Sequence, residues 1–171
     1  AALVAASFPL TAEERRGDPA ASRRWLVDSG LAEGSVVVAA DEHERLLALR
    51  AIVRGLLEAN HETAAGPDDG ALAELAATHP APLAVSADGG LELDLRPVDT
   101  VDGFVAQVLG IIFEARALGT FERLKICACD ECRWAFYDTS RNRGGIWCRM
   151  EECGNRIKNR RYRQRRAAGA A

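Results

Sequence analysis

Several features that define common classes of protein are missing from this chain of 171 residues. No apolar run approaches the roughly 18 residues of a membrane helix, so we expect no membrane partner. The apolar residues 1–8 follow no basic region, which is not typical of a signal peptide. The sequence shows no paired nucleophile and base and no glycine-rich loop that could cradle a phosphate, so we expect no enzymatic activity. His43, His61 and His79 are scattered, and none is assigned a catalytic role.

Cysteine is absent from residues 1–126, and all five cysteines fall within residues 127–153. A secreted domain with a disulfide framework distributes its cysteines through the fold, so this crowding excludes such a framework. A reducing, cytoplasmic location is the prediction that follows.

The crowded cysteines form two pairs with the same spacing, Cys127-x4-Cys132 and Cys148-x4-Cys153. Two short loops that each supply two thiolates meet the tetrahedral preference of Zn²⁺. Because Cys129 also lies in the first group, the residues alone allow either the x4 spacing or an x2 spacing that uses Cys129. Four thiolates leave no open position for water, so the predicted zinc ion is structural and not catalytic.

Charge divides the chain into two parts. Residues 1–120 carry 9 Lys and Arg against 19 Asp and Glu, a net charge of −10, whereas residues 121–171 carry 13 against 6, a net charge of +7. An acidic body with a basic end is typical of a protein whose end binds nucleic acid.

The basic end contains a run, residues 156–166, with seven cations and no acid. In a helix these cations would surround most of the axis, so the helix needs an anionic partner. We predict that this partner is the phosphate backbone of double-stranded DNA. The alternative is that the helix docks on the acidic part of the same chain or of a neighbour. The predicted contact residues are Arg156, Lys158, Arg160, Arg161, Arg163, Arg165 and Arg166.

The acidic part shows mainly helical patterns. Asp18 followed by Pro19 is a helix start, and Asp41 with Glu44 resembles a capping box. Asp99 or Thr100 is expected to cap a long helix that ends at Gly119, with Phe113 and Leu118 on its wide apolar face. We predict a mainly α fold with one β-hairpin and a loop at residues 66–70. The expected helices are 20–29, 41–60, 71–78 and 100–118, and the expected hairpin strands are 83–86 and 91–95.

The predicted organisation is an acidic helical domain at residues 1–120, a zinc module with its basic helix at residues 121–166, and a disordered alanine-rich tail at residues 167–171. No Gly/Pro/Ser-rich linker separates the first two parts, so we expect the module to be docked on the body. A small module is short of core, so its aromatic residues are expected to pack inside it rather than stack on bases. These are Trp134, Phe136, Tyr137 and Trp147.

The cysteine-rich region contains a set of linked motifs. They are Leu124-Lys125-x-Cys127, Cys132-Arg133-Trp134-x-Phe136-x-Asp138-x-Ser140-Arg141-Asn142, Trp147-Cys148-x-Met150 and Cys153-Gly154-Asn155-Arg156-x-Lys158. Together these motifs resemble the CGNR zinc finger family. The resemblance implies a treble-clef-like module whose ligands are Cys127, Cys132, Cys148 and Cys153, which leaves Cys129 as a spare thiol.

Such fingers follow a mainly helical domain called ABATE, described as a stress-induced transcription regulator, and residues 25–31 resemble the early signature of that domain. Two departures stand out. The family's usual opening Leu-Asp-Phe-x-Asn-Thr-like stretch is missing near residues 1–8, and residues 144–146 replace the basic residues that usually precede the Trp-Cys pair.

The resemblance and the charge together predict a bacterial-type DNA-binding transcriptional regulator that holds one structural Zn²⁺. Its helical domain would bind a small-molecule effector or form a homodimer. The alternative function is an adaptor in which zinc only shapes the module and the basic helix binds an acidic protein surface.

Overall fold

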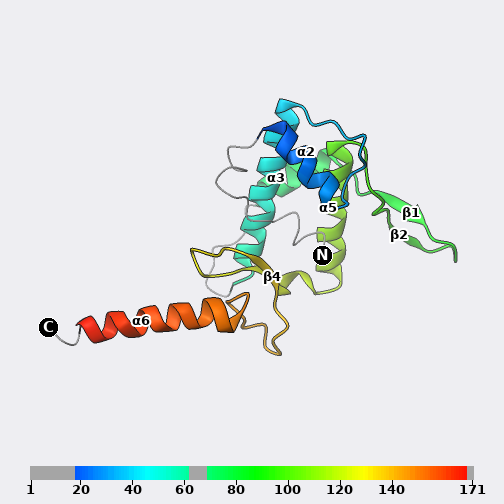
Figure 1. Cartoon of the computed structure of the whole chain (residues 1–171). Helices are drawn as coiled ribbons and strands as arrows, with labels where there is room; N and C mark the ends of the chain where they lie inside the picture. The colour runs from blue at the N-terminus through cyan, green and yellow to red at the C-terminus, as the bar shows by residue number, and fades with distance from the viewer. Residues whose placement is uncertain (1–17, 62–68, 169–171) are drawn as a thin grey trace.

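The computed structural model describes residues 18–61 and 69–168, and residues 1–8 and most of the predicted 66–70 loop lie outside these ranges. The predicted mainly α fold class is confirmed (Figure 1). The helices are α2 (Pro19–Asp28), α3 (Ala40–Ala59), α4 (Asp69–Thr78), α5 (Val101–Ala117) and α6 (Asn155–Ala168). The antiparallel strand pairs are β1 (Leu83–Val85) with β2 (Leu91–Leu93) and β3 (Leu124–Ile126) with β4 (Ala135–Tyr137). Two shorter turns are η2 (Phe121–Arg123) and η3 (Met150–Gly154).

The second strand pair was not expected from the sequence. In β3 and β4, Leu124 pairs with Tyr137 and Ile126 pairs with Ala135. Three residues in each strand are too few to show an alternating pattern, which explains why the pair escaped prediction.

The ends of α5 follow local rules that the sequence displays. The hydroxyl of Thr100 accepts a hydrogen bond from the backbone N–H of Gly103 at 3.2 Å. The helix ends just before Gly119, which has a φ of 64°, a left-handed conformation that glycine adopts without strain.

The predicted capping box of α3 is wrong. The helix begins at Ala40, and the carboxylate of Glu42 accepts a hydrogen bond from the backbone N–H of Ala39 at 2.8 Å. Asp41 and Glu44 therefore lie inside the helix, because the extended segment before it ends at Ala39, two residues earlier than the pattern indicated.

The main core lies between α2, α3 and α5. Trp25 meets Phe104 edge to face with ring centroids 5.8 Å apart, and Leu26 is fully buried. Two apolar residues assigned to the stripe of α5 lie outside the core, since Phe113 is 72% exposed and Leu118 is 69% exposed. The apolar face of α5 is wider than the surface that α3 and η2 cover.

The core continues into the C-terminal part of the chain. Leu124, Ile126 and Ala135 belong to the same buried cluster as the residues of α3 and α5. At the end of α3, the Asn60 side chain donates to the carbonyls of Phe121 and Leu124, both at 2.8 Å. The strand pair is therefore packed directly on the helical body, as the missing linker indicated.

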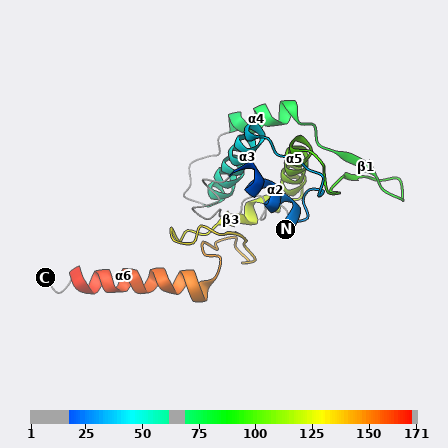
Figure 2. The same ribbon diagram turned by 45° about the horizontal axis from the view of Figure 1, so that its top comes forward.

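Helix α6 extends away from the body in both views (Figures 1 and 2). Its helical part runs through Ala168, so residues 167–168 are helical and not disordered as expected; residues 169–171 lie outside the described range. No helix within residues 18–61 or 69–168 has both the length and the apolarity needed to cross a bilayer.

Candidate metal centre and basic helix

Four cysteines converge where the strand pair meets η3. The Sγ atoms of Cys127, Cys132, Cys148 and Cys153 all lie within 4.8 Å of one another. The Sγ atom of Cys148 is 3.7 Å from the Sγ atoms of both Cys132 and Cys153. Of the two spacings that the residues left open, this cluster contains the x4 pair, and the thiol of Cys129 is not part of it.

The sulfur–sulfur distances fit a tetrahedral zinc site. With Zn–S bonds of about 2.3 Å, the edge of a regular tetrahedron is about 3.8 Å. A disulfide would instead bring two sulfurs to about 2.05 Å. The four thiols are thus arranged as ligands of one tetrahedral ion rather than as two cystines.

The loop that carries Cys127 and Cys132, which we call the first knuckle, is held by backbone hydrogen bonds around Cys129. The backbone N–H groups of Cys132 and Arg133 donate to the carbonyl of Cys129 at 2.8 and 2.9 Å, and the N–H of Cys127 donates to the carbonyl of Trp134 at 2.8 Å. Cys129 is fully buried. In this geometry Cys129 contributes a carbonyl to the turn and its side chain to the packing.

The loop that carries Cys148 and Cys153, the second knuckle, shows why the motif at 153–156 has a glycine and an asparagine at its second and third positions. The N–H groups of Cys153 and Gly154 both donate to the carbonyl of Arg149, at 3.1 and 3.3 Å, within the π-helical turn η3. A Cβ atom on Gly154 would overlap the sulfur of Met150 and lie 3.1 Å from Trp147. The Asn155 side chain then donates to the carbonyl of Glu151 at 3.4 Å. This turn sets the direction in which α6 leaves the metal site.

Burial raises the pKa values of two of the four thiols. Burial, with hydrogen bonding from Cys132, raises the pKa of Cys148 to about 11, and burial with the neighbouring thiols raises the pKa of Cys153 further still. At neutral pH these two thiols hold their protons without a metal. Metal binding must therefore release protons, and the metal affinity increases with pH.

A buried ion pair beside the metal cluster was missed by the sequence analysis, although both residues belong to the motif that carried the resemblance. Nζ of Lys125 lies 3.0 Å from Oδ2 of Asp138, and both side chains are 3% exposed. Lys125 also donates to the carbonyls of Arg143 and Gly145. Burial by itself raises the pKa of Asp138, but hydrogen bonds from Ser140, Lys125 and Gly145 outweigh it and hold that pKa below its ordinary value.

The glycine that departs from the family pattern has a steric role next to this pair. The backbone N–H of Gly145 donates to Oδ2 of Asp138 at 2.8 Å. A Cβ atom at this position would lie 2.5 Å from Oδ1 of Asp138. The small residue allows the loop to approach the carboxylate.

The body also holds the first knuckle through polar contacts from α3. The Arg54 side chain donates to the carbonyl of Arg133 at 3.0 Å, and the Arg133 guanidinium is paired with Glu58. Nε2 of His61 lies 2.7 Å from the carbonyl of Ile126. These contacts join residues more than 60 positions apart, so no local pattern could have indicated them.

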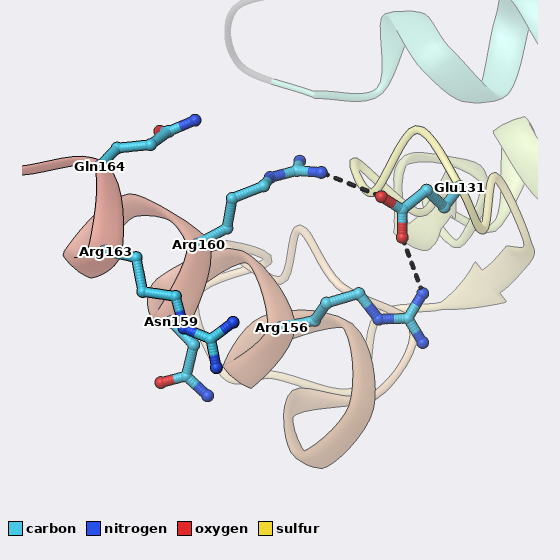
Figure 3. Close-up of a pocket in the computed structure, with 6 residues that line it drawn as sticks. All are labelled: Glu131, Arg156, Asn159, Arg160, Arg163 and Gln164. Carbon is cyan, nitrogen blue, oxygen red and sulfur yellow. Dashed lines mark hydrogen bonds and ion pairs between the residues drawn. The ribbon is translucent and has the colours of Figure 1, made fainter. Parts of the chain in front are cut away.

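The seven cations of α6 are all exposed, and two of them contact an acid of the zinc module. Nη1 of Arg156 and Nη1 of Arg160 each lie 3.0 Å from a carboxylate oxygen of Glu131, on the loop between Cys127 and Cys132 (Figure 3). The Arg166 guanidinium lies 5.9 Å from the centre of the Tyr162 ring. Within the described ranges, no cation of α6 pairs with an acid of the helical body.

The aromatic residues of the module are only partly inside it. Phe136 and Trp147 pack against the buried cysteines, as predicted. Trp134 and Tyr137 are 39% and 47% exposed, so the expectation that they are core residues is wrong. Strand β3 packs on α3, whereas the main contacts of β4 are with β3, and Tyr137 and the neighbouring Trp134 remain partly in solvent.

We predict that Cys148→Ser lowers the zinc content of the purified chain well below one ion per molecule, because a hydroxyl is a poor replacement for a zinc-bound thiolate. Metal analysis of the dialysed protein measures this. The matched control is Cys129→Ser, which we expect to leave the zinc content unchanged. Full zinc retention by the Cys148 variant, or zinc loss by the Cys129 variant, would contradict the assignment.

Two family models match the chain. A model described as "Putative stress-induced transcription regulator", named ABATE, matches residues 2–121. A model described as "CGNR zinc finger" matches residues 123–166. A comparison with curated proteins finds no match. The resemblance predicted from residues 25–31 and from the cysteine motif is confirmed.

Proposed function

The chain belongs to the ABATE family and carries a C-terminal CGNR zinc finger, and from this premise we propose that it is a DNA-binding transcription regulator of bacterial type that acts in a stress response. The acidic helical part, at residues 1–120, is the regulatory part. The module at residues 121–166 binds double-stranded DNA through α6. The family description supports transcription regulation, and the basic helix supports DNA as the partner.

The observation that carries this proposal is the position of α6. The helix stands clear of the acidic body, so its cations are not neutralised by that body's carboxylates (Figures 1 and 2). A helix with seven exposed cations and no anion in residues 156–166 attracts a polyanion. Each phosphate contact releases counterions, which is the main source of affinity for duplex DNA.

The zinc ion has a structural role in this proposal. Cys127, Cys132, Cys148 and Cys153 would hold it, and as a dication it would neutralise half of the charge of four thiolates. The ion joins the first knuckle to the turn that precedes α6. The turn η3 then sets the direction in which α6 is presented to DNA.

The helical part contains a hollow that is large enough for a small-molecule effector. It has a volume of about 570 Å³ and lies between the end of the β1–β2 pair and α5. Asp94, Arg96 and Gln107 are among its polar lining residues. We propose this hollow as the effector site. We keep a homodimer as the second way in which the helical part could regulate binding.

We predict that replacing Lys158, Arg161 and Arg165 together with alanine weakens binding to all duplex sequences alike. The slope of log affinity against log salt should fall by up to about three units, since each lost phosphate contact removes roughly 0.9. Fluorescence anisotropy with labelled duplexes at several salt concentrations measures both quantities. The matched control is Arg24→Ala in α2, an exposed cation of the helical body, which should leave the slope unchanged.

The adaptor function predicts a different outcome in the same titration. The zinc-loaded chain would then show no measurable affinity for duplex DNA at low salt and would bind an acidic protein instead. That result would reject the regulator proposal.

A further inference from the structure

One face of α6 differs in composition from the rest of the helix. Arg156, Asn159, Arg160, Arg163 and Gln164 are spaced by three and four residues, so they share one side of the helix. Together with Glu131 they line an open hollow of about 440 Å³ (Figure 3). Lys158, Arg161 and Arg165 lie on the opposite side.

The side chains on this face are the types that distinguish base pairs. Arginine binds the O6 and N7 atoms of guanine with two hydrogen bonds, and asparagine or glutamine binds the N6 and N7 atoms of adenine. Amide side chains also bind phosphate oxygens, but on this face two amides stand among three arginines, and together they offer partners for both adenine and guanine. The presence of Asn159 and Gln164 between the arginines therefore favours base recognition on this side of the helix.

Glu131 fixes two of these side chains before any ligand arrives. Its two carboxylate oxygens each accept one hydrogen bond, from Arg156 and from Arg160, both at 3.0 Å. The hydrogen bond that Arg156 donates to Glu131 is the largest cause of the raised pKa of Arg156. Glu131 lies between Cys127 and Cys132, so its backbone is held by the metal knuckle. An arginine held in this way loses less side-chain entropy when it binds a base.

The shape of α6 suits the major groove. The groove of B-form DNA is about 12 Å wide and admits one α-helix. Beyond Ile157 every residue of α6 up to Ala167 is exposed, so the 14-residue helix presents both of its sides to a ligand. One side can face the base edges while the opposite side faces the flanking phosphates.

We infer that Arg156, Asn159, Arg160, Arg163 and Gln164 form the base-reading face of a recognition helix, and that Glu131 is a positioning residue that sets its specificity. This inference rests on the proposed DNA-binding function and adds which residues read sequence. The carboxylate acts in two ways. It orients two arginines toward base edges, and its negative charge weakens binding to phosphates in general.

The test begins with selection of preferred sites from synthetic duplexes with a randomised central segment, using the zinc-loaded full chain. Affinities for the selected duplex and for a scrambled duplex are then measured at several salt concentrations. Asn159→Ala should lower the affinity for the selected duplex by about 5- to 150-fold and relax the preference at one base pair. Its affinity for the scrambled duplex and its salt slope should not change.

Glu131→Gln gives the sharper result. It should raise the affinity for the scrambled duplex and lower the ratio of selected to scrambled affinity. The matched control is Asp130→Asn, which removes the same charge from the same loop; Asp130 makes no ion pair with any residue of the described ranges. This control should raise both affinities together and leave the ratio unchanged. Zinc content and melting temperature should match the wild type in all three variants.

The outcomes separate this inference from the proposed function. If the chain binds DNA but the selection yields no preferred sequence, or if Asn159→Ala and Glu131→Gln leave the affinity ratio unchanged, the base-reading face is rejected and the DNA-binding function stands. If the chain binds no duplex DNA, the proposed function fails, and this inference fails with it.

Discussion

Removal of zinc by a chelator is expected to melt α6, to abolish DNA binding and to leave the helical body folded. Zinc contributes on the order of 10 kcal/mol to the folding of small modules of this kind. Helix α6 depends on that contribution, because its contacts with the rest of the chain are concentrated at its first turn, next to η3. The module shares the core of the body, but most of the buried residues of that core lie in the body itself, so the body should keep most of its packing without the metal.

The sequence of α6 gives a second reason for the loss. A helix of 14 residues is marginal in water by itself, and like charges four residues apart, as in Arg156 with Arg160, destabilise it further. Four thiolates on Zn²⁺ carry a net charge of −2 at the N-terminus of this helix, where negative charge interacts favourably with the helix dipole. Chelation removes both the anchor and this stabilising charge.

Circular dichroism measures the expected change. Helix α6 supplies 14 helical residues, whereas α2, α3, α4 and α5 supply 10, 20, 10 and 17, so the helix signal should fall by a minority of its value. Added zinc should restore both the signal and DNA binding, and added magnesium should not, since magnesium prefers oxygen ligands. Collapse of the whole helix signal would show instead that metal and body stabilise one cooperative unit.

The Asp138→Ala substitution is expected to lower the free energy of unfolding of the zinc-loaded chain by about 3–5 kcal/mol. It would leave the ammonium of Lys125 buried without its counter-ion, and it would remove the acceptor of the backbone N–H groups of Ser140 and Gly145. Chemical denaturation at constant free zinc measures the change. The double variant Lys125→Met with Asp138→Leu should be less destabilised than Asp138→Ala, because no charge is left buried.

An exposed ion pair of the same loop provides the control. Glu122 lies 3.6 Å from Arg143, and both side chains are about half exposed. Glu122→Ala should therefore cost about 0–1 kcal/mol. A loss in Asp138→Ala no larger than the loss in Glu122→Ala would show that the buried pair is dispensable.

The pH dependence of this loss follows from the direction of the pKa shift. The pKa of Asp138 is lowered in the folded chain, so its stabilising contribution is complete above the ordinary carboxylate pKa of about 3.9 and disappears as pH falls toward the lower folded value. The difference between wild type and Asp138→Ala should thus be constant near neutral pH and shrink only in acid.

Features with short sequence separation could be predicted. Gly119 indicated the end of α5, Thr100 was one of two predicted caps for its start, and the two cysteine spacings indicated a four-thiol site. The cysteines could not by themselves decide between Cys127 and Cys129, because both spacings are compatible with a knuckle. The structure decides it: Cys127 directly follows the end of β3 at Ile126 and joins the thiol cluster, whereas the side chain of Cys129 lies in the packed interior.

Features that depend on distant residues could not be predicted. The pairing of Arg156 with Glu131 spans 25 positions and requires the metal cluster to bring two loops together. The contact of His61 with Ile126 spans 65 positions. The four exposed apolar residues Phe113, Leu118, Trp134 and Tyr137 were misassigned because hydrophobicity indicates which residues can be buried, whereas burial depends on which surfaces a neighbouring element covers.

The sequence by itself determined that the chain has an acidic helical part, a cysteine-rich module and a basic helix, because charge, spacing and helical periodicity are local properties. Only the tertiary structure decided that the module shares the core of the body, that Lys125 and Asp138 form a buried pair, and that α6 points away from the acidic surface. The shared core, the buried pair and the direction of α6 all depend on how each strand or turn is oriented relative to the element that precedes it. That orientation is set by packing between segments far apart in the chain, which one-dimensional patterns do not record.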